Sequence, residues 1–287
     1  MESSSLVARL TLCGTFSALA VACAAGQAPA TAAHETPVRL AAAGDLPHSS
    51  TELSVEAPAT PASDIPKEHT VEPTAGQACP ESMVLVEGRY CTEARQVCSD
   101  WMDPPSLSVA RCREFAPSEC VGQRAQKRFC VDKDEYTKKG ETLPQTDTSW
   151  TTAKETCEGE GKRLCLETEW ELACEGEQMN AYSIGARRDS TKCNYDLMDL
   201  TDNKGKLRDY RKPSAELTQC VSPYGIRNMT GNVDEWVMRD RTNGQWRSAM
   251  KGGWWMAARN RCRPATTAHD EHYSGAQSGF RCCTDAK

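Results

Sequence analysis

The first 78 residues have almost no aromatic side chains. Phe16 is the one aromatic residue among them, whereas all seven Trp and all seven Tyr follow residue 78. Cysteine is distributed in the same way, since only Cys13 and Cys23 lie in this part of the chain. A segment without aromatic side chains buries too little apolar surface to offset the entropy that it loses on folding. We therefore expect one folded domain, residues 79–287, behind an unfolded N-terminal region.

Three further absences narrow the class of protein. There is no basic stripe of the kind that binds nucleic acid, and residues 24–78 carry most of the formal net charge of -6. There is no repeated C-x-x-C pattern, so the cysteines after residue 78 favour a disulfide framework and an oxidising compartment over zinc. The apolar run Leu10–Ala22 is too short to span a bilayer. We expect an exported protein that binds no nucleic acid.

Residues 1–23 have the pattern of a signal peptide, in which a polar start precedes a short apolar run. The sequence Leu19-Ala-Val-Ala-Cys23 resembles the lipobox of a bacterial lipoprotein. This resemblance implies a lipid on Cys23 and a location at the membrane of the bacterial cell envelope. The alternative is an ordinary signal peptide cut near Ala22 or Ala25, which would give a secreted or periplasmic protein. Residues 24–78, acidic and with seven prolines, are typical of an extended tether.

Sequence patterns in the folded region predict the α+β class. Met83–Tyr90 is rich in β-forming residues, and Arg128–Tyr136 alternates apolar and polar residues as a half-buried strand does. Trp150–Glu158 is expected to form a helix. A second helix is expected to begin at Thr168, whose hydroxyl would form a capping box with Glu171.

The segment at about 91–130 reads as an insertion that is too broken for long helices. It contains five cysteines, counting both ends, and the pair Pro104-Pro105. Local disulfides would be needed to hold such a segment. After the second helix, turn signals recur without a long periodic run, so we expect short strands joined by irregular loops.

Oxygen-bearing side chains are concentrated in one turn of the C-terminal third. Asn228, Asn232, Asp234 and Glu235 lie within eight positions, between a turn signal and a short aromatic strand. Carboxylate, amide and carbonyl oxygens suit a hard cation such as calcium better than a metal that prefers thiolates.

Four ordered sequence blocks resemble the formylglycine-generating enzyme, or sulfatase-modifying factor, family. They are Gly161–Cys174 with its G-K-R-L and E-x-E-W-E, the N-x-x-G-N-V-x-E-W of Asn228–Trp236, the K-G-G of Lys251–Trp255, and the closing G-F-R-C of Gly279–Cys283. The resemblance implies a C-type-lectin-like fold in which two helices pack on short, twisted antiparallel strands with long loops.

The resemblance also implies a calcium site at the turn. The family's ligands fall on Asn228, Gly231, Val233 and Glu235, with the middle two binding through backbone carbonyls. The alternative is a plain turn with a solvated Glu235.

Two disulfides follow from the same resemblance. The family's pairs fall on Cys157 with Cys282 and on Cys174 with Cys262. Cys283 is adjacent to Cys282 and should point to the opposite face of its strand, so it needs a different partner. The other pairings cannot be deduced from the sequence.

The family's catalytic cysteines are missing. Family oxidases bind copper between two cysteines five residues apart, and the first of these falls on Ala257, while the segment with the second is shortened directly to Arg261-Cys262. Trp254 occupies the position of a family serine, and Asp234 the position of a family indole. A methyl group cannot bind copper, so we expect neither copper nor the family's oxidase activity.

Two groups of side chains could form other sites. Trp and Arg are enriched at recognition surfaces, so a binding cleft could lie among Trp254, Trp255, Arg259, Arg261 and Arg263, together with Asp234 and His269. Core aromatics that alternate with exposed arginines would give the same pattern. His269-Asp-Glu-His272 could offer ligands to zinc or iron, although four consecutive polar residues are more typical of a solvated turn. Iron is not expected, because the family's iron ligands come from an additional helical domain.

These observations favour a non-catalytic binding or scaffold module of the cell envelope, with calcium as a structural ion and a peptide, protein or glycan as ligand. The alternative is an oxidoreductase of the formylglycine-generating or non-haem-iron type with a rearranged metal site. It would take its thiols from Cys165, Cys193 or Cys220, or bind iron at His269 and its neighbours. Free thiols distinguish the two, because an oxidase must keep two of them.

Overall fold

The computed structural model describes residues 77–241, 244–257 and 259–287. The expected signal peptide, Cys23 and nearly all of the expected tether lie outside the described residues. The elements in chain order are β1 (Met83–Cys91), β2 (Ala94–Arg95), β3 (Cys98–Trp101), β4 (Cys112–Phe115), β5 (Glu119–Cys120), β6 (Arg124–Asp132), α1 (Trp150–Gly159), β7 (Arg163–Leu164), α2 (Glu167–Glu175), β8 (Asp234–Met238), β9 (Ser248–Lys251), β10 (Ala265–Thr266), β11 (Ser278–Phe280) and β12 (Cys282–Asp285).

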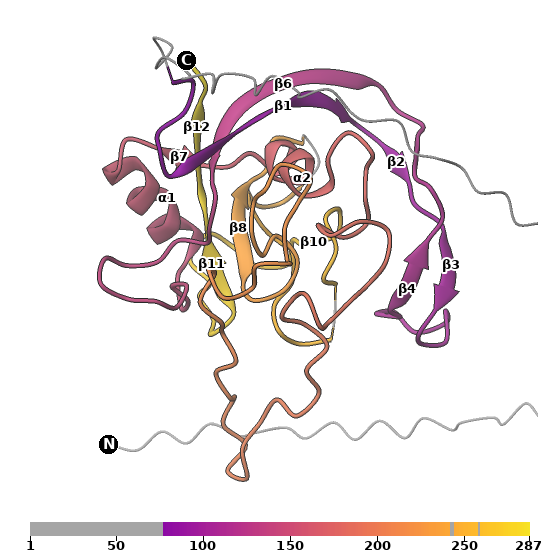
Figure 1. Ribbon diagram of the computed structural model, residues 1–287. Coiled ribbons are helices and arrows are strands. Elements are labelled where there is room, and N and C mark those ends of the chain that lie inside the picture. Colours follow the sequence, from indigo (N-terminus) through magenta and orange to yellow (C-terminus); the bar gives the residue numbers. More distant parts are fainter. Residues whose placement is uncertain (1–76, 242–243, 258) are drawn as a thin grey trace, which may run out of the picture. The chain divides into compact units, whose positions relative to one another are not determined.

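Two four-stranded sheets hold the domain together, and their strand orders are β1-β6-β12-β7 and β10-β9-β8-β11 (Figure 1). The first sheet is antiparallel throughout, and β1 pairs with β6 from Met83 opposite Asp132 to Cys91 opposite Arg124. In the second sheet β11 runs parallel to β8, which differs from the purely antiparallel arrangement that the resemblance implies. The class is α+β, as predicted.

Strand β6 does not alternate as the sequence predicts. Phe129, Cys130, Val131 and Asp132 are buried in succession, and the strand ends there, four residues before Tyr136. Both faces of this end are covered, because Phe129 and Val131 face the main core while Cys130 packs with Cys79 and Met83. Alternation of polarity holds only where one face of a strand meets water.

Helix α1 begins as predicted, and Ser149 caps it by accepting the N–H of Thr152 at 3.1 Å. Helix α2 begins at Glu167, and the predicted capping box is wrong. The carboxylate of Glu169 accepts the N–H of Leu166 at 2.9 Å, whereas the Thr168 hydroxyl bonds to Asp240. None of the described helices is both long enough and apolar enough to span a membrane.

Every cysteine among the described residues is in a disulfide. Cys157 pairs with Cys282 and Cys174 with Cys262, which are the two pairs that the resemblance implies. They join α1 to β12, and the C-terminal end of α2 to the loop after β9. The remaining pairs are Cys79–Cys130, Cys91–Cys120, Cys98–Cys112, Cys165–Cys283 and Cys193–Cys220. Two of these close loops within the insertion, where β3 and β4 form a hairpin at one side of the domain (Figure 1).

Candidate functional site

The turn that contains the predicted calcium ligands is buried and tightly wound. Asn228, Gly231 and Asn232 have positive φ angles of 58°, 92° and 63°. At Gly231 the backbone passes so close to Asn194 that a Cβ would lie 2.5 Å from its carbonyl oxygen, so only glycine fits. The Asn228 side chain is 1% exposed, and its Oδ1 has no hydrogen-bond partner among the described residues. A buried amide oxygen without a donor needs another partner, and a bound cation is one that would satisfy it.

A second carboxylate, which the sequence analysis did not identify, lies beside this turn. Glu135 is 2% exposed and accepts hydrogen bonds from Ser214 at 2.6 Å, from Asn228 at 2.9 Å and from Asn232 at 3.0 Å. Burial, followed by the nearby charge of Glu235, raises the pKa of Glu135 to about 7. The segment after β6 packs against a turn that lies some 93 residues later in the chain.

Glu235 is fully buried and bound to Arg281 on both of its oxygens. Arg281 donates from Nη2 to Oε1 and from Nε to Oε2, each at 2.7 Å, and the Trp170 indole donates to Oε2 at 2.7 Å. When Glu135 and Glu235 are both ionised, Arg281 balances only one of the two charges. One of the two carboxylates then has no balancing cation within the site.

The turn therefore fits a hard cation. Asn228 Oδ1 offers an unused oxygen, Glu235 offers Oε1, which accepts a single hydrogen bond, and the backbone offers the carbonyls of Gly231 and Val233. No three His, Cys, Asp or Glu side chains among the described residues gather in a metal-binding arrangement. The calcium set contains a single carboxylate, so that observation does not bear on it.

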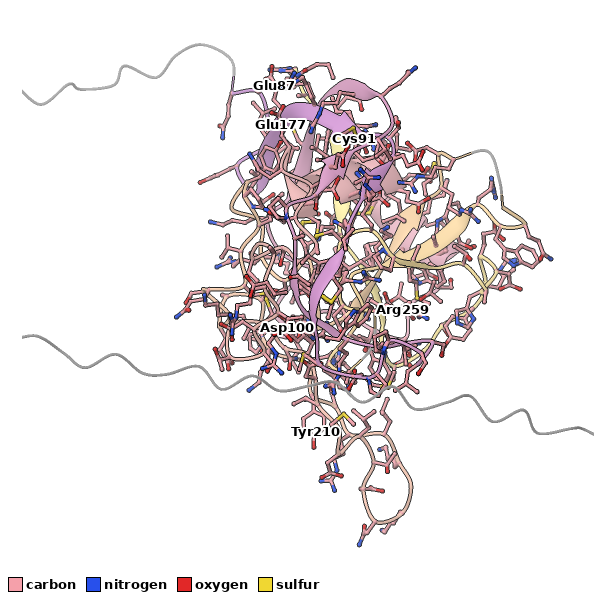
Figure 2. All side chains as sticks on the ribbon, turned by 90° about the vertical axis from the view of Figure 1, so that its right-hand side faces the viewer. Glu87, Cys91, Asp100, Glu177, Tyr210 and Arg259 are labelled. Carbon is pink, nitrogen blue, oxygen red and sulfur yellow. A yellow bond between two sulfur atoms is a disulfide. The ribbon has the colours of Figure 1, made fainter. Side chains whose placement is uncertain are left out.

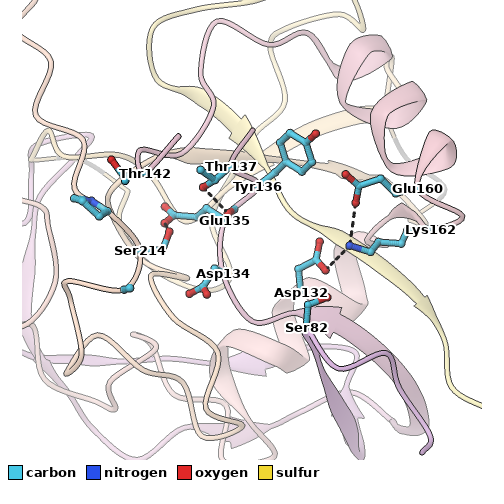
Figure 3. Close-up of a pocket in the computed structure, with 12 residues that line it drawn as sticks. Ser82, Asp132, Asp134, Glu135, Tyr136, Thr137, Thr142, Glu160, Lys162 and Ser214 are labelled. Atoms are coloured by element: carbon cyan, nitrogen blue, oxygen red, sulfur yellow. Dashed lines mark hydrogen bonds and ion pairs between the residues drawn. The ribbon is translucent and has the colours of Figure 1, made fainter. Parts of the chain in front are cut away.

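On the other side of Glu135 lies a cavity of about 450 Å³ (Figure 3). Asp132, Asp134 and Glu160 line it with Glu135, and Lys162 donates to Asp132 at 2.9 Å and to Glu160 at 3.1 Å. Asp134 is also paired outside the cavity, with Arg227. The cavity and the turn thus share one buried carboxylate.

The region of the expected cleft begins at the turn after β9. Gly252 and Gly253 have φ angles of 87° and 68°, and the Gly253 N–H donates to buried Asp234 at 3.2 Å. Burial raises the pKa of Asp234 to about 7. Trp254 and Trp255 meet edge to face with ring centroids 4.9 Å apart, and Trp255 lines a cavity of about 260 Å³.

The structure separates the remaining residues of the expected cleft. Arg263 forms a two-point ion pair with Glu175, at 2.8 and 2.6 Å. Arg261 lies over the ring of Phe115, and Arg259 bonds to Thr266 at the surface. His269 stacks on Tyr273, with ring centroids 3.7 Å apart. Arg259 still lies near enough to Asp234 for its charge to lower the pKa of that carboxyl, whereas Arg261, Arg263 and His269 contact other parts of the domain.

The model of the sulfatase-modifying factor enzyme 1-like domain matches residues 78–286. The chain belongs to this family. Its domain has the C-type-lectin-like fold of the formylglycine-generating-enzyme type. No curated protein matches the sequence. CarF is 14% identical, with a TM-score of 0.46 over 72% of this chain and 99% of its own. PvdO from Pseudomonas aeruginosa is 14% identical, with a TM-score of 0.46 over 71% and 94%. Treponema denticola variable protein 1 is 14% identical, with a TM-score of 0.43 over 71% and 94%.

The copper position of the sulfatase-modifying factor family does not fit copper in this member. Ala257 stands where the first catalytic cysteine would be and offers a methyl group. The cysteines named for a rearranged site are also in disulfides, Cys165 with Cys283 and Cys193 with Cys220. A disulfide sulfur is not a thiolate and does not bind Cu(I) in its place.

Proposed function

We propose that this sulfatase-modifying factor domain is a non-catalytic binding or scaffold module whose ligand is a peptide, a protein or a glycan. The observation that carries the proposal is the state of the thiols. Ala257 replaces one copper ligand, and each cysteine of the described residues has a disulfide partner. A reaction that requires two free thiolates finds no thiolate for its metal among the described residues.

An assay of formylglycine formation tests this proposal. The purified protein is incubated with a C-x-P-x-R peptide, copper and oxygen, and the product is analysed for the aldehyde by mass spectrometry. Free thiols are counted in denaturant in the same sample. We expect no aldehyde and no free thiol in the folded domain. Aldehyde formation by the wild-type chain, unchanged in Ala257→Cys, would show that the chain is an enzyme with its chemistry elsewhere.

Calcium is the structural ion that we propose for the turn. Three features of the site support it: the unpartnered Asn228 Oδ1, the two buried carboxyl groups of Glu135 and Glu235 beside the single cation Arg281, and the tight backbone turn that requires glycine at position 231. Bound there, the ion would supply positive charge to a buried carboxylate pair and would hold the turn closed.

A lipid anchor on Cys23 and a location at the bacterial cell envelope are also proposed, from the Ala-Val-Ala-Cys junction and the proline-rich segment behind it. Membrane fractionation of cells that express the full chain tests the anchor. We expect the wild-type protein with the membranes and Cys23→Ser in the soluble fraction. Cys13→Ser serves as the matched control and should stay with the membranes. Membrane association that Cys23→Ser leaves unchanged contradicts the anchor.

A further inference from the structure

The insertion carries most of the large apolar side chains that the domain exposes. Eight such side chains are exposed among the described residues, and six of them belong to the insertion. The six are Val97, Trp101, Met102, Leu107, Val109 and Val121, and the other two are Leu85 and Met198. Trp101, Leu107 and Val109 are 42%, 54% and 53% exposed. Single apolar residues are normal on a surface, but a group of them within one short segment indicates a partner.

Four of the six lie in the hairpin tip, which we define as residues 101–110, at the end of the β3–β4 hairpin. Asp103 is the one charged residue in this stretch of the sequence. Its carboxylate is turned back towards β4, where Arg111 donates to its two oxygens at 2.7 and 2.8 Å. Beside the tip, Asp100 and Arg113 form an ion pair at 3.2 Å. The hairpin tip therefore presents apolar and uncharged polar side chains, with no unpaired charge to desolvate.

Backbone hydrogen bonds and a disulfide hold the hairpin tip in shape. The N–H groups of Leu107, Ala110 and Met102 donate to the carbonyls of Pro104, Leu107 and Arg111, at 3.0, 3.1 and 3.0 Å respectively. Cys98 and Cys112 join the two strands below it, and Arg111 lies 3.5 Å from Asp196 in the body of the domain. Figure 2 looks onto the side of the domain that carries the hairpin and labels Asp100, which is next to the tip. A surface that is ordered before it binds loses little conformational entropy on binding.

The expected tether is long enough to let the hairpin tip reach the membrane that holds the anchor. The tether joins the domain near Cys79, whose disulfide to Cys130 lies beside the first half of β1, whereas the insertion follows Cys91 at the other end of that strand. Nine residues of strand are about 30 Å long. A flexible chain of the length of residues 24–78 has a root-mean-square span of about 40 Å. A domain anchored through Cys23 can therefore turn this end towards the bilayer.

We propose that the hairpin tip inserts into the interface of a phospholipid bilayer, with Trp101, Leu107 and Val109 as the inserting side chains. The inference rests on the proposed lipid anchor at Cys23, and it adds a second, weaker contact with the same membrane. A tryptophan beside aliphatic side chains is the composition found at membrane interfaces. An anchor on a tether keeps the hairpin tip close to the lipid, so a contact too weak to hold the free protein becomes effective.

The size and the charge of the hairpin tip favour a bilayer over a protein partner. A stable protein interface uses roughly 20–30 residues from each side, whereas the hairpin tip is a short segment with four large apolar side chains. Two copies that met tip to tip would bury too little surface for a stable dimer. The charges that could select a protein partner, Asp103 and Arg111, are already paired with each other. A bilayer needs neither a complementary shape nor a complementary charge.

Fluorescence quenching by vesicles of brominated phosphatidylcholine measures the insertion. Residues 1–78 contain no Trp, so the emission reports on the domain alone. Full-length wild-type protein is reconstituted into the vesicles, and full-length Cys23→Ser protein is titrated with them. We expect the lipid to quench a component of the wild-type emission that Trp101→Phe removes. Cys23→Ser should show the same component only at lipid concentrations on the order of millimolar, and high salt should not change it, because no unpaired charge takes part.

Two leucine variants in the Cys23→Ser chain decide whether the contact is local. Leu107→Ser should raise the lipid concentration at half-maximal quenching roughly fivefold, because it removes apolar surface from the hairpin tip. Leu85→Ser also removes an exposed leucine, but on β1 outside the insertion, and should leave that concentration unchanged. Equal shifts in both variants, or unquenched Trp101 in vesicle-bound wild-type protein, would overturn the inference.

A contact between copies of the chain would give a different result. Trp101 emission that shifts with protein concentration in the absence of lipid would assign the hairpin tip to such a contact and would overturn insertion into a bilayer. Failure of the lipid anchor is detected separately, as membrane fractionation that Cys23→Ser leaves unchanged. Failure of the non-catalytic role is detected by a positive aldehyde assay.

Discussion

Two buried charged regions of this domain lie close together and differ in how completely they are paired. The α2 network consists of Glu171, Glu175, Lys251, Arg241, Arg263 and Tyr90. Lys251 contacts Glu171 at 2.7 Å, the Tyr90 hydroxyl donates to the other oxygen of Glu171 at 2.6 Å, and Arg263 pairs with Glu175. The turn site consists of Asn228, Gly231, Val233 and Glu235 with their neighbour Glu135. It has an unpaired oxygen, and two buried carboxyl groups share one arginine.

The buried charges of the α2 network are paired within the chain and stabilise the fold, whereas the buried groups of the turn site leave an oxygen open for a ligand. An ionised group in the interior is tolerated when a partner replaces its water, and the α2 network meets that condition within the chain itself. At the turn site Arg281 compensates Glu235, and a proton or an added cation compensates Glu135. Trp255 Nε1 belongs with the turn site in this respect, because it too lacks a partner that the described residues could supply.

The largest expected effect is in the α2 network. Lys251→Ala should lower the free energy of unfolding by about 3–5 kcal/mol, because it removes the fully buried cation beside Glu171 and leaves that carboxylate with the partly exposed Arg241 alone. Chemical denaturation measures this. Lys154→Ala is the control, since its pair with Glu158 is exposed and should contribute at most about 0.5 kcal/mol. Similar losses of unfolding free energy in both variants would mean that a buried ion pair stabilises this domain no more than an exposed one.

The second effect concerns the disulfide that fastens the end of α2. Cys174 and Cys262 are 88 residues apart, whereas Cys98 and Cys112 in the insertion are 14 apart. In the chain-entropy account, removing the longer loop's bond should cost roughly 1.5 kcal/mol more, within the usual range of about 2–5 kcal/mol. Denaturation of the two double-serine variants measures the difference. Equal losses of unfolding free energy in the two variants would contradict the expectation that the longer loop's disulfide stabilises the domain more.

The third effect tests the turn site. Calcium should raise the Tm of the wild-type domain, and a chelator should lower it, because the ion binds the folded state alone; a 100-fold excess over Kd corresponds to about 2.7 kcal/mol. Asn228→Ala should remove the response, since it deletes the unpaired oxygen. Asn203→Ala, at an exposed position, should keep it. A wild-type melting curve indifferent to both calcium and chelator contradicts the site.

The smallest effect is a dependence on pH. Burial raises the pKa values of Glu135, Glu175 and Asp234 to about 7, above those of the unfolded chain. Their stabilisation is therefore complete below the unfolded values, which are 4.5 for the two glutamates and 3.8 for Asp234, and is lost as pH rises through 7. We expect calcium-free protein to melt a few degrees lower at pH 8 than at pH 5.

Calcium adds a control to this measurement. It should reduce the part of the pH dependence that comes from Glu135 and leave the part from Glu175, which lies in the α2 network. Glu135→Gln should likewise flatten the curve, whereas Glu81→Gln, at an exposed position, should not. A Tm that rises steadily from pH 5 to pH 8 would contradict the burial of these carboxyls in protonated form.

The residue pattern within each segment predicted where helices and strands begin, but it did not predict which side chains from other segments contact them. The strand that starts at Met83 and the helix that starts at Trp150 are where the sequence places them. The predicted capping box of Thr168 and Glu171 does not form, because the Glu171 carboxylate is buried and bonds to Lys251, 80 residues later in the chain. A glutamate on a helix looks solvated in any local window, and only the rest of the fold can supply its cation.

The sequence by itself determined the family, the α+β class and the loss of the copper thiolate, since each depends on which residue stands in a motif, as Ala257 does. Tertiary structure alone decided that Glu135 joins the turn site, that the arginines of the expected cleft face different ways, and that Trp255 keeps a free N–H. The physical reason is that a motif specifies chemistry at short range. The cost of burying a charge or a donor depends on partners that long-range packing brings to it or withholds.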